Sequence, residues 1–149
     1  MREINIVNRE MTSDEFTRMN AGFDEHALEN NVAIQNSERL GFVCLDGNKF
    51  IGCSSGLAYK NDKDYSGWFY LTDLFVEKEY RSQGWGSKLL KSIEELAISY
   101  GVRYIWLWTS HDGALKFYKR AGYKKFTELE NWYSDGRSRV GLRKNFKTK

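Results

Sequence analysis

Two glycines stand between an arginine and an amphipathic run in the segment from Arg81 to Leu90, which reads RSQGWGSKLL. Glycine is a poor helix former, but it lets another group approach the main chain more closely than a Cβ would allow. The first N–H groups of a helix have no partner within the helix, and the helix dipole places partial positive charge there. The segment therefore predicts a phosphate site at the start of a helix, with Arg81 adding charge and Ser87 a hydroxyl.

The spacing of these glycines excludes two well-known kinds of phosphate site. No Gly-Lys-Ser/Thr follows a four-residue gap, so the segment is not a Walker loop. Leu89 stands where a dinucleotide-binding fingerprint carries its third glycine. From this segment alone, the alternative is a glycine turn that serves only the close packing of a helix on a strand.

Asp73 is the second residue whose setting suggests chemistry. It lies in the segment from Trp68 to Val76, WFYLTDLFV, which is the most strand-like part of the chain. Aspartate is disfavoured in strands, and its neighbours Leu71, Leu74 and Phe75 are apolar, so we expect a buried carboxylate. A buried carboxylate is costly unless it is paired. Asp73 is then either held for an incoming ammonium group or paired for structural reasons with a buried arginine, tyrosine or tryptophan.

The elements that must position these residues alternate along the chain and predict one α/β domain over residues 1–149. Asp46 and Gly47, between two apolar runs, predict a hairpin. Gly101 and Gly122 are expected to end helices. We expect strands over about 2–8, 40–45, 50–53, 68–76, 102–109, 123–132 and 139–142, and helices over about 12–31, 85–100 and 114–121.

The composition fits a folded protein without a membrane span, since 29% of the residues are charged and 15% aromatic. No apolar run approaches the roughly 18 residues that a span needs, and the first ten residues lack the apolar stretch of a secretory signal. Cys44 and Cys53 are too few for a disulfide framework and match no metal-ligand spacing. We therefore expect two buried, reduced thiols in a cytoplasmic protein that holds no metal.

Charge is distributed unevenly along the chain, whose net charge is +3. Residues 1–30 carry three basic and seven acidic side chains, whereas residues 112–149 carry eleven basic and four acidic ones. A nucleic-acid-binding module would use such a basic segment. Here the charges are spread through strand-like and helical segments, which favours a solvated face that helps to attract a polyanionic cofactor. We predict no nucleic-acid partner.

Two motifs in sequence order resemble the signatures of the GNAT acetyltransferases. The first, Val76-x4-Arg81-x2-Gly84-x-Gly86, leads into a helix and resembles that family's acetyl-CoA-binding motif. The second, about forty residues downstream, is Ala114-x2-Phe117-Tyr118-x3-Gly122-Tyr123. The resemblance implies a mixed, mostly antiparallel sheet of about seven strands, flanked by about four helices. It also implies that the sheet splays open in a V between the strands at 68–76 and 102–109.

The resemblance implies acetyl-CoA as co-substrate and a role for each matched residue. Pantetheine would pair with the main chain of the strand that ends at Val76, and the pyrophosphate would lie at the glycine turn. Tyr118 matches the tyrosine that acts as general acid toward the departing thiolate, and Asp73 matches an acidic residue that serves the substrate amine. The cofactor-binding residues so implied are Leu74, Phe75, Val76, Arg81, Ser82, Gln83, Gly84, Trp85, Gly86, Ser87, His111 and Phe117.

Two positions depart from the family's pattern. Diamine acetyltransferases carry Glu immediately before the Asp, where this chain has Thr72. Many members have Asn three residues before the helix alanine, where this chain has His111. His111 either contacts pantetheine, acts as a base near neutral pH, or is simply exposed before the helix.

The function predicted from these motifs is transfer of an acetyl group from acetyl-CoA to a primary amine of a small molecule, by direct attack in a ternary complex. The resemblance is to the diamine and aminoglycoside acetyltransferases in particular. The alternatives are acetylation of a protein lysine or N-terminus, and a non-catalytic acyl-CoA-binding module. Pairing of the last two strands with a second copy predicts a homodimer.

Overall fold

The hairpin predicted from Asp46 and Gly47 is present, and its two turn residues are Gly47 and Asn48, whereas Asp46 is the last residue of the first strand. In the computed structural model, which describes residues 2–61, 64–110 and 113–146, strand β1 (Asn36–Asp46) pairs antiparallel with β2 (Lys49–Asn61). Gly47 has a φ of +60°, a conformation that glycine adopts without strain. Strand β3 (Asp64–Val76) adds to the other edge of β2, also antiparallel, and completes the first half of the sheet.

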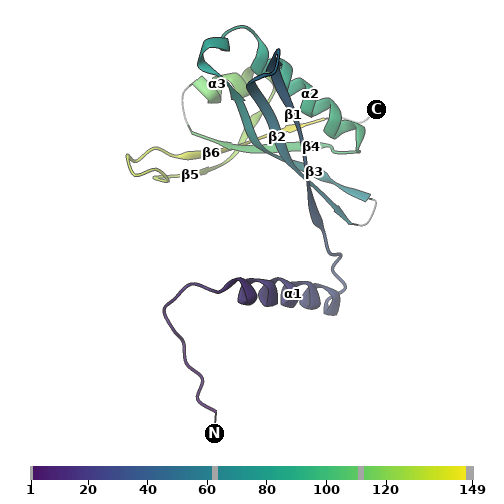
Figure 1. Ribbon diagram of the computed structural model, residues 1–149, viewed down its shortest axis with the longest axis vertical. Coiled ribbons are helices and arrows are strands. Elements are labelled where there is room, and N and C mark those ends of the chain that lie inside the picture. Colours follow the sequence, from purple (N-terminus) through teal and green to yellow (C-terminus); the bar gives the residue numbers. More distant parts are fainter. Residues whose placement is uncertain (1, 62–63, 111–112, 147–149) are drawn as a thin grey trace. The chain divides into compact units, whose positions relative to one another are not determined.

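The second half of the sheet consists of β4 (Tyr104–Thr109), β5 (Lys124–Leu129) and β6 (Arg139–Asn145). The strand order is β1-β2-β3-β4-β6-β5, and β3–β4 is the parallel pair in an otherwise antiparallel sheet (Figure 1). The prediction of a mixed, mostly antiparallel sheet is confirmed, with six strands among the described residues instead of about seven. The difference is the segment 2–8, which contains Ile4 and Ile6 and forms no strand in the described chain.

Three α-helices and one short 3-10 helix accompany the sheet in the described chain, where about four helices were predicted. They are α1 (Ser13–Glu29), η1 (Lys78–Tyr80), α2 (Trp85–Ser99) and α3 (Gly113–Arg120). Helix α2 packs against β1, β2 and β3 through an apolar stripe at helical spacing that includes Leu90, Ile93 and Ala97. None of the described helices is long and apolar enough to cross a membrane.

A buried polar group ties α2 to the second half of the sheet. Glu94 on α2 is 8% exposed, and its Oε2 accepts a hydrogen bond of 2.8 Å from the Tyr123 hydroxyl and lies 3.3 Å from Lys144 Nζ. Burial, and then the Glu94 charge, raise the pKa of Tyr123 far above its usual range, so that its hydroxyl stays a donor. The carboxylate is therefore paired, as a buried charge requires, and fixes α2 against the start of β5 and the end of β6.

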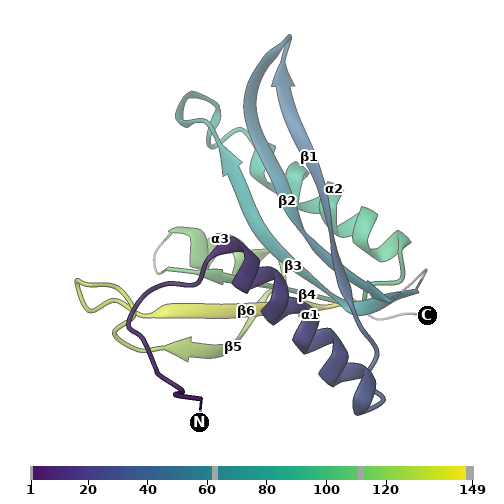
Figure 2. The same ribbon diagram turned by 60° about the horizontal axis from the view of Figure 1, so that its bottom comes forward.

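Strands β3 and β4 pair over a short distance and then diverge (Figure 2). Their register runs from Trp68 opposite Tyr104 to Tyr70 opposite Trp106, and β3 continues to Val76 beyond the last pair. This is the splay that the predicted fold requires between these two strands. It leaves the β4-facing edge of residues 71–76 without a partner strand in the described part of the chain.

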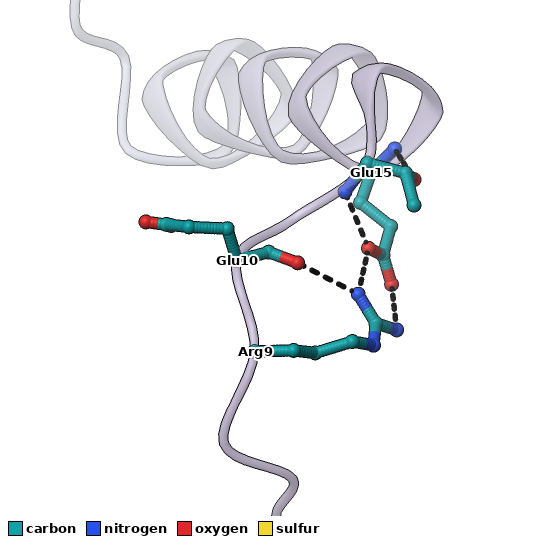
Figure 3. A network of polar contacts seen from close by, with 4 residues as sticks. Arg9, Glu10 and Glu15 are labelled. Carbon is teal, nitrogen blue, oxygen red and sulfur yellow. Dashed lines mark hydrogen bonds and ion pairs between the residues drawn. The ribbon is translucent and has the colours of Figure 1, made fainter.

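The chain divides into two units, residues 1–34 and 35–149, which are described separately, and the prediction of one domain stays a prediction. In the first unit α1 runs unbroken through Gly22 and begins with a capping box. Thr12 Oγ1 accepts from the Glu15 amide, and Glu15 Oε1 accepts from the Thr12 amide at 2.8 Å. Arg9 adds a two-bond contact to the Glu15 carboxylate at 2.8 and 3.0 Å (Figure 3).

The start of α1 is expected to depend on this capping box and on pH. Thr12→Ala should destabilise the helix by about 1 kcal/mol because it leaves the Glu15 amide unpaired. The contact with Arg9 lowers the pKa of Glu15 to about 2. Because the folded pKa lies below the ordinary value of 4.5, the stabilisation is present above that pH and is lost as the pH falls through about 2. Cα chemical shifts of residues 13–17 in a pH titration measure both effects, and shifts that stay constant to pH 2 would contradict the second.

Candidate active site

The predicted glycine turn lies between η1 and the first residue of α2. Gly84 is the N-cap of α2 with a φ of +87°, and no side chain caps the helix there. The first amides of α2 therefore have neither an intrahelical nor a side-chain acceptor. Ser82, with a φ of +62°, is a second left-handed residue in the same turn. The turn thus presents unpaired N–H groups at the positive end of a fifteen-residue helix, which is the setting that binds anions.

A pocket of about 390 Å³ lies over this turn and brings most of the predicted pyrophosphate residues together. The Arg81 Nε donates to the carbonyl oxygen of Val76 at 2.9 Å, which holds the guanidinium at the end of β3. Within the described chain, the two Nη groups of Arg81 donate no hydrogen bond and are available to a ligand. The pocket is lined by Val76, Tyr80, Arg81, Ser82, Gly84, Trp85, Gly86, Ser87, Phe117 and Arg120.

The two glycines of the turn are there for different reasons. Gly84 adopts a positive φ, which by itself favours glycine. Gly86 does not, and a Cβ on Gly86 would lie 3.7 Å from the Phe117 ring, which is ordinary van der Waals contact. Neither backbone conformation nor close packing of α2 on its neighbours therefore requires a glycine at position 86. The Cβ is missing at a residue that faces the pocket.

Tyr118 lies on α3, one residue beyond Phe117, and is 9% exposed. Its ring packs edge-on against the rings of Phe117 and Tyr123, with centroids 5.2 and 5.7 Å away. Burial raises the pKa of Tyr118 to about 12, so the phenol is protonated throughout the neutral range. Its hydroxyl forms no hydrogen bond with any described residue, and Tyr118 itself is not among the residues that line the pocket at the start of α2.

Asp73 is exposed, and the expectation of a buried carboxylate is wrong. The side chain is 59% exposed, and its ion-pair partner is Arg39, itself 55% exposed, at 3.7 Å between Nη1 and Oδ2. The cause is an irregularity in the β2–β3 pairing, where Asp73 faces Ser55 but Leu71 faces Gly56. The extra residue, Thr72, is a β-bulge that puts two successive side chains on one face. Thr72 Oγ1 accordingly lies 2.7 Å from Asp73 Oδ2, and the sheet turns the carboxylate toward solvent.

The sequence model of the Acetyltransferase (GNAT) family matches residues 5–123. The chain belongs to the GNAT family. A relative, the thialysine N-epsilon-acetyltransferase of Sus scrofa, is 38% identical over 78 residues, which make up 47% of this chain and 45% of that protein. The chain thus matches about half the length of this curated relative.

Solved structures show the same fold over nearly the whole chain. An acetyltransferase from Bacillus cereus ATCC 14579 superposes with a TM-score of 0.77 at 24% identity, over 95% of this chain and 98% of that one. An aminoglycoside 6′-N-acetyltransferase complexed with coenzyme A superposes with a TM-score of 0.64 at 20% identity, over 75% of each chain. Together with the family match, they confirm the α/β GNAT fold that the two motifs predict.

The remaining predicted cofactor residues of this GNAT chain are placed less uniformly. Leu74 packs against the core, and Phe75, 40% exposed, stacks on Phe50 with ring centroids 6.3 Å apart. Gln83 lies outside the pocket lining, and its Nε2 donates to the Glu79 carbonyl at 3.2 Å. The prediction for His111 lies outside the described residues. Main-chain pairing of pantetheine with Leu74, Phe75 and Val76 stays a prediction.

A second hollow of about 620 Å³ adjoins the first and shares Ser87, Phe117 and Arg120 with it. Four of its lining residues are basic, and its one carboxylate, Glu94, is already paired with Lys144. The GNAT motifs did not point to Tyr80, which lines the first pocket, or to Lys116 and Arg120, which line the second. The signal for the last two was the i, i+4 spacing of basic residues on α3, which puts both on one helix face. Part of the positive charge of residues 112–149 thus gathers beside the anion pocket.

Proposed function

We propose that the protein is an acetyl-CoA-dependent N-acetyltransferase whose acceptor is the primary amine of a small molecule. The observation that carries this proposal is the pocket at the start of α2, where uncapped amides, the Cβ-free Gly86 and Arg81 meet the helix of Tyr118. Coenzyme A carries a diphosphate that fits such amides and a thioester that needs a proton donor. Family membership and the named activity of the thialysine relative support the same reading.

The reaction needs a neutral amine and a proton for the leaving sulfur. The ammonium first loses a proton, and the nitrogen lone pair then forms a bond to the acetyl carbonyl carbon. As the tetrahedral intermediate collapses, the C–S bond breaks and its electron pair leaves on sulfur. Tyr118 gives its proton to that thiolate and becomes a phenolate. The proton that the attacking nitrogen then loses returns to the Tyr118 phenolate through solvent, which gives the neutral amide and a free thiol.

The high pKa of Tyr118 is compatible with the role of proton donor. A phenol with a pKa of about 12 is a weak acid, but it is always loaded with its proton at neutral pH. The burial that disfavours phenolate disfavours a thiolate at the same place, so it raises the basicity of the leaving group as well. Because burial raises the pKa of the phenol and of the leaving thiol together, the difference between the two pKa values is smaller than the raised pKa of Tyr118 alone suggests.

Direct attack is favoured over an acyl-cysteine intermediate. Cys53 lies on β2 opposite Phe75, next to the strand predicted to hold pantetheine. Burial, and then the charge of Asp73, raise the pKa of Cys53, which keeps it a thiol and a poor nucleophile. Cys44 and Cys53 are both free and half-buried, which corrects the expectation of fully buried thiols.

The proposal is tested by calorimetry with acetyl-CoA, followed by thiol release with a panel of amines. The panel contains polyamines, aminoglycosides, amino acids and lysine peptides. We expect heat with acetyl-CoA and turnover of small amines. Binding without turnover of any amine would leave a non-catalytic acyl-CoA-binding module, and turnover of lysine peptides alone would make the protein a peptide acetyltransferase. Homodimerisation and a cytoplasmic location stay predictions.

A further inference from the structure

Beside the bulge of β3, one face of the sheet carries an arginine and a carboxylate that are held together from three strands. Arg39 on β1 donates from Nη1 to Ser55 Oγ on β2 at 3.0 Å and to Thr72 Oγ1 on β3 at 2.9 Å. Thr72 Oγ1 in turn lies 2.7 Å from Asp73 Oδ2. The hydroxyls of Ser55 and Thr72 thus fix the guanidinium next to the carboxylate, at the point where β3 has left β4.

The ion pair between Arg39 and Asp73 stabilises the fold too little to explain why the two side chains are held together. Nη1 and Oδ2 are 3.7 Å apart, and both side chains are more than half exposed, so the ion pair contributes little. Within the described chain, the Arg39 groups Nη2 and Nε donate no hydrogen bond, and neither does any residue donate to Asp73 Oδ1. Arg39 Nη1 and Asp73 Oδ2 thus hold the two side chains in place, while Arg39 Nη2 and Nε and Asp73 Oδ1 keep their capacity to form hydrogen bonds with a ligand.

An aromatic surface adjoins the pair on the same face. Tyr70 precedes Thr72 by two residues on β3, and its ring stacks on Trp106 of β4 with centroids 4.2 Å apart. The surface continues into a hollow of about 360 Å³ lined by Trp68, Trp106, Trp108 and Phe126. Arg139 lies over Trp108 at 4.9 Å from the ring centroid. Its guanidinium therefore already covers one aromatic face that the ammonium group of a cationic ligand would otherwise use.

We propose that Arg39 and Asp73 together recognise an α-amino carboxylate: Asp73 holds the amine that is acetylated, and Arg39 binds the carboxylate one carbon away. The close spacing of the two charges matches an amine and a carboxylate on neighbouring atoms, and the aromatic surface suits an apolar side chain. A diamine fits less well, because its second ammonium would lie near the like charges of Arg39 and Arg139. In addition, this chain has Thr72 where the diamine enzymes carry a second acidic residue. This inference rests on the proposed function and names its acceptor class.

The experiment compares kcat/KM for L-phenylalanine with that for phenethylamine, which lacks the carboxylate, in three variants. The wild type is expected to prefer phenylalanine, and Arg39→Gln is expected to lower kcat/KM for phenylalanine about tenfold, since it removes a charge-assisted contact. In Arg39→Gln, kcat/KM for phenethylamine and the KM for acetyl-CoA should both be unchanged. Arg39→Lys keeps the charge without the planar fork and should fall between the two. The matched control is Arg103→Gln, because Arg103 is an exposed arginine immediately before β4 whose side chain forms no hydrogen bond or ion pair in the described chain. This variant should change kcat/KM for neither amine.

The outcomes separate this inference from the proposed function. Two results would overturn the inference: equal kcat/KM for phenethylamine and phenylalanine in the wild type, or an equal fall in kcat/KM for both amines in Arg39→Gln. Either result would mean that Arg39 does not bind the carboxylate, and neither would contradict the proposed acetyltransferase activity. If neither amine nor any member of the wider panel is acetylated, the proposed function fails and takes the inference with it. A loss confined to phenylalanine in Arg39→Gln supports both.

Discussion

Replacing Tyr118 with phenylalanine is expected to lower kcat by about 10²- to 10⁴-fold, the usual contribution of a positioned general acid. Acetyl-CoA binding should persist, because the phenyl ring still fills the space against Phe117 and Tyr123. The hydroxyl has no hydrogen-bond partner among the described residues, so its removal leaves no buried group unpaired and should not lower stability. The measurement is single-turnover thiol release together with calorimetry of acetyl-CoA binding.

The control for this substitution is Tyr100→Phe, which removes a hydroxyl from a 43% exposed tyrosine that stacks on Tyr65. It should leave kcat unchanged. If Tyr118→Phe also turns over at the wild-type rate in a folded protein, Tyr118 is a core aromatic and the proton comes from elsewhere. Equal losses of kcat in both variants would point to a general effect on folding.

The pH dependence provides a second check on Tyr118. Since burial raises its pKa to about 12, no fall in rate from ionisation of this phenol is expected up to pH 10. The rate should instead rise with pH as the amine loses its proton. The same shift affects stability: the folded pKa lies above the ordinary value of 10, so the stabilisation is complete below pH 10 and is lost as the pH rises through about 12.

The sequence predicts those parts of the site that depend on local backbone rules. The glycine turn, the start of α2 and the helix of Tyr118 follow from glycine conformation and helical spacing over a few residues. The exposure of Asp73 does not, because it depends on a bulge whose register is set by β2, about eighteen residues away. Arg39 was missed for the same reason, since it meets Thr72 across three strands at a separation of 33 residues.

The failed strand at 2–8 shows the same limit from another side. Alternation of Ile4 and Ile6 predicts which residues would share a face, but a strand also needs an edge to pair with, and alternation carries no information on that. The basic hollow near Arg120 is an intermediate case. The spacing of Lys116 and Arg120 predicts that they share a helix face, whereas only the packing of α3 beside α2 puts that face next to the anion pocket.

Gly86→Ala is expected to weaken acetyl-CoA binding by about ten- to a hundredfold, which corresponds to the loss of one hydrogen bond of about 1.5–3 kcal/mol from a main-chain amide to the charged diphosphate. The free protein should be as stable as the wild type or more so, because alanine is the better helix former and the added Cβ meets the Phe117 ring at an ordinary 3.7 Å. The opposite signs of the two effects are what distinguish a ligand-binding glycine from a packing glycine. Thermal unfolding without ligand and calorimetry with acetyl-CoA measure them separately.

Two further glycines make this test specific. Gly22→Ala, in the interior of α1 with 3.8 Å to the nearest side-chain atom, should raise helix stability and leave acetyl-CoA affinity unchanged. Gly84→Ala should lose stability as well as affinity, because its φ of +87° strains any residue with a side chain. If Gly86→Ala instead binds acetyl-CoA as tightly as the wild type, the diphosphate does not touch the main chain at the start of α2. The missing Cβ would then have no role in binding, and the anion site would have to be sought in the basic hollow of α3.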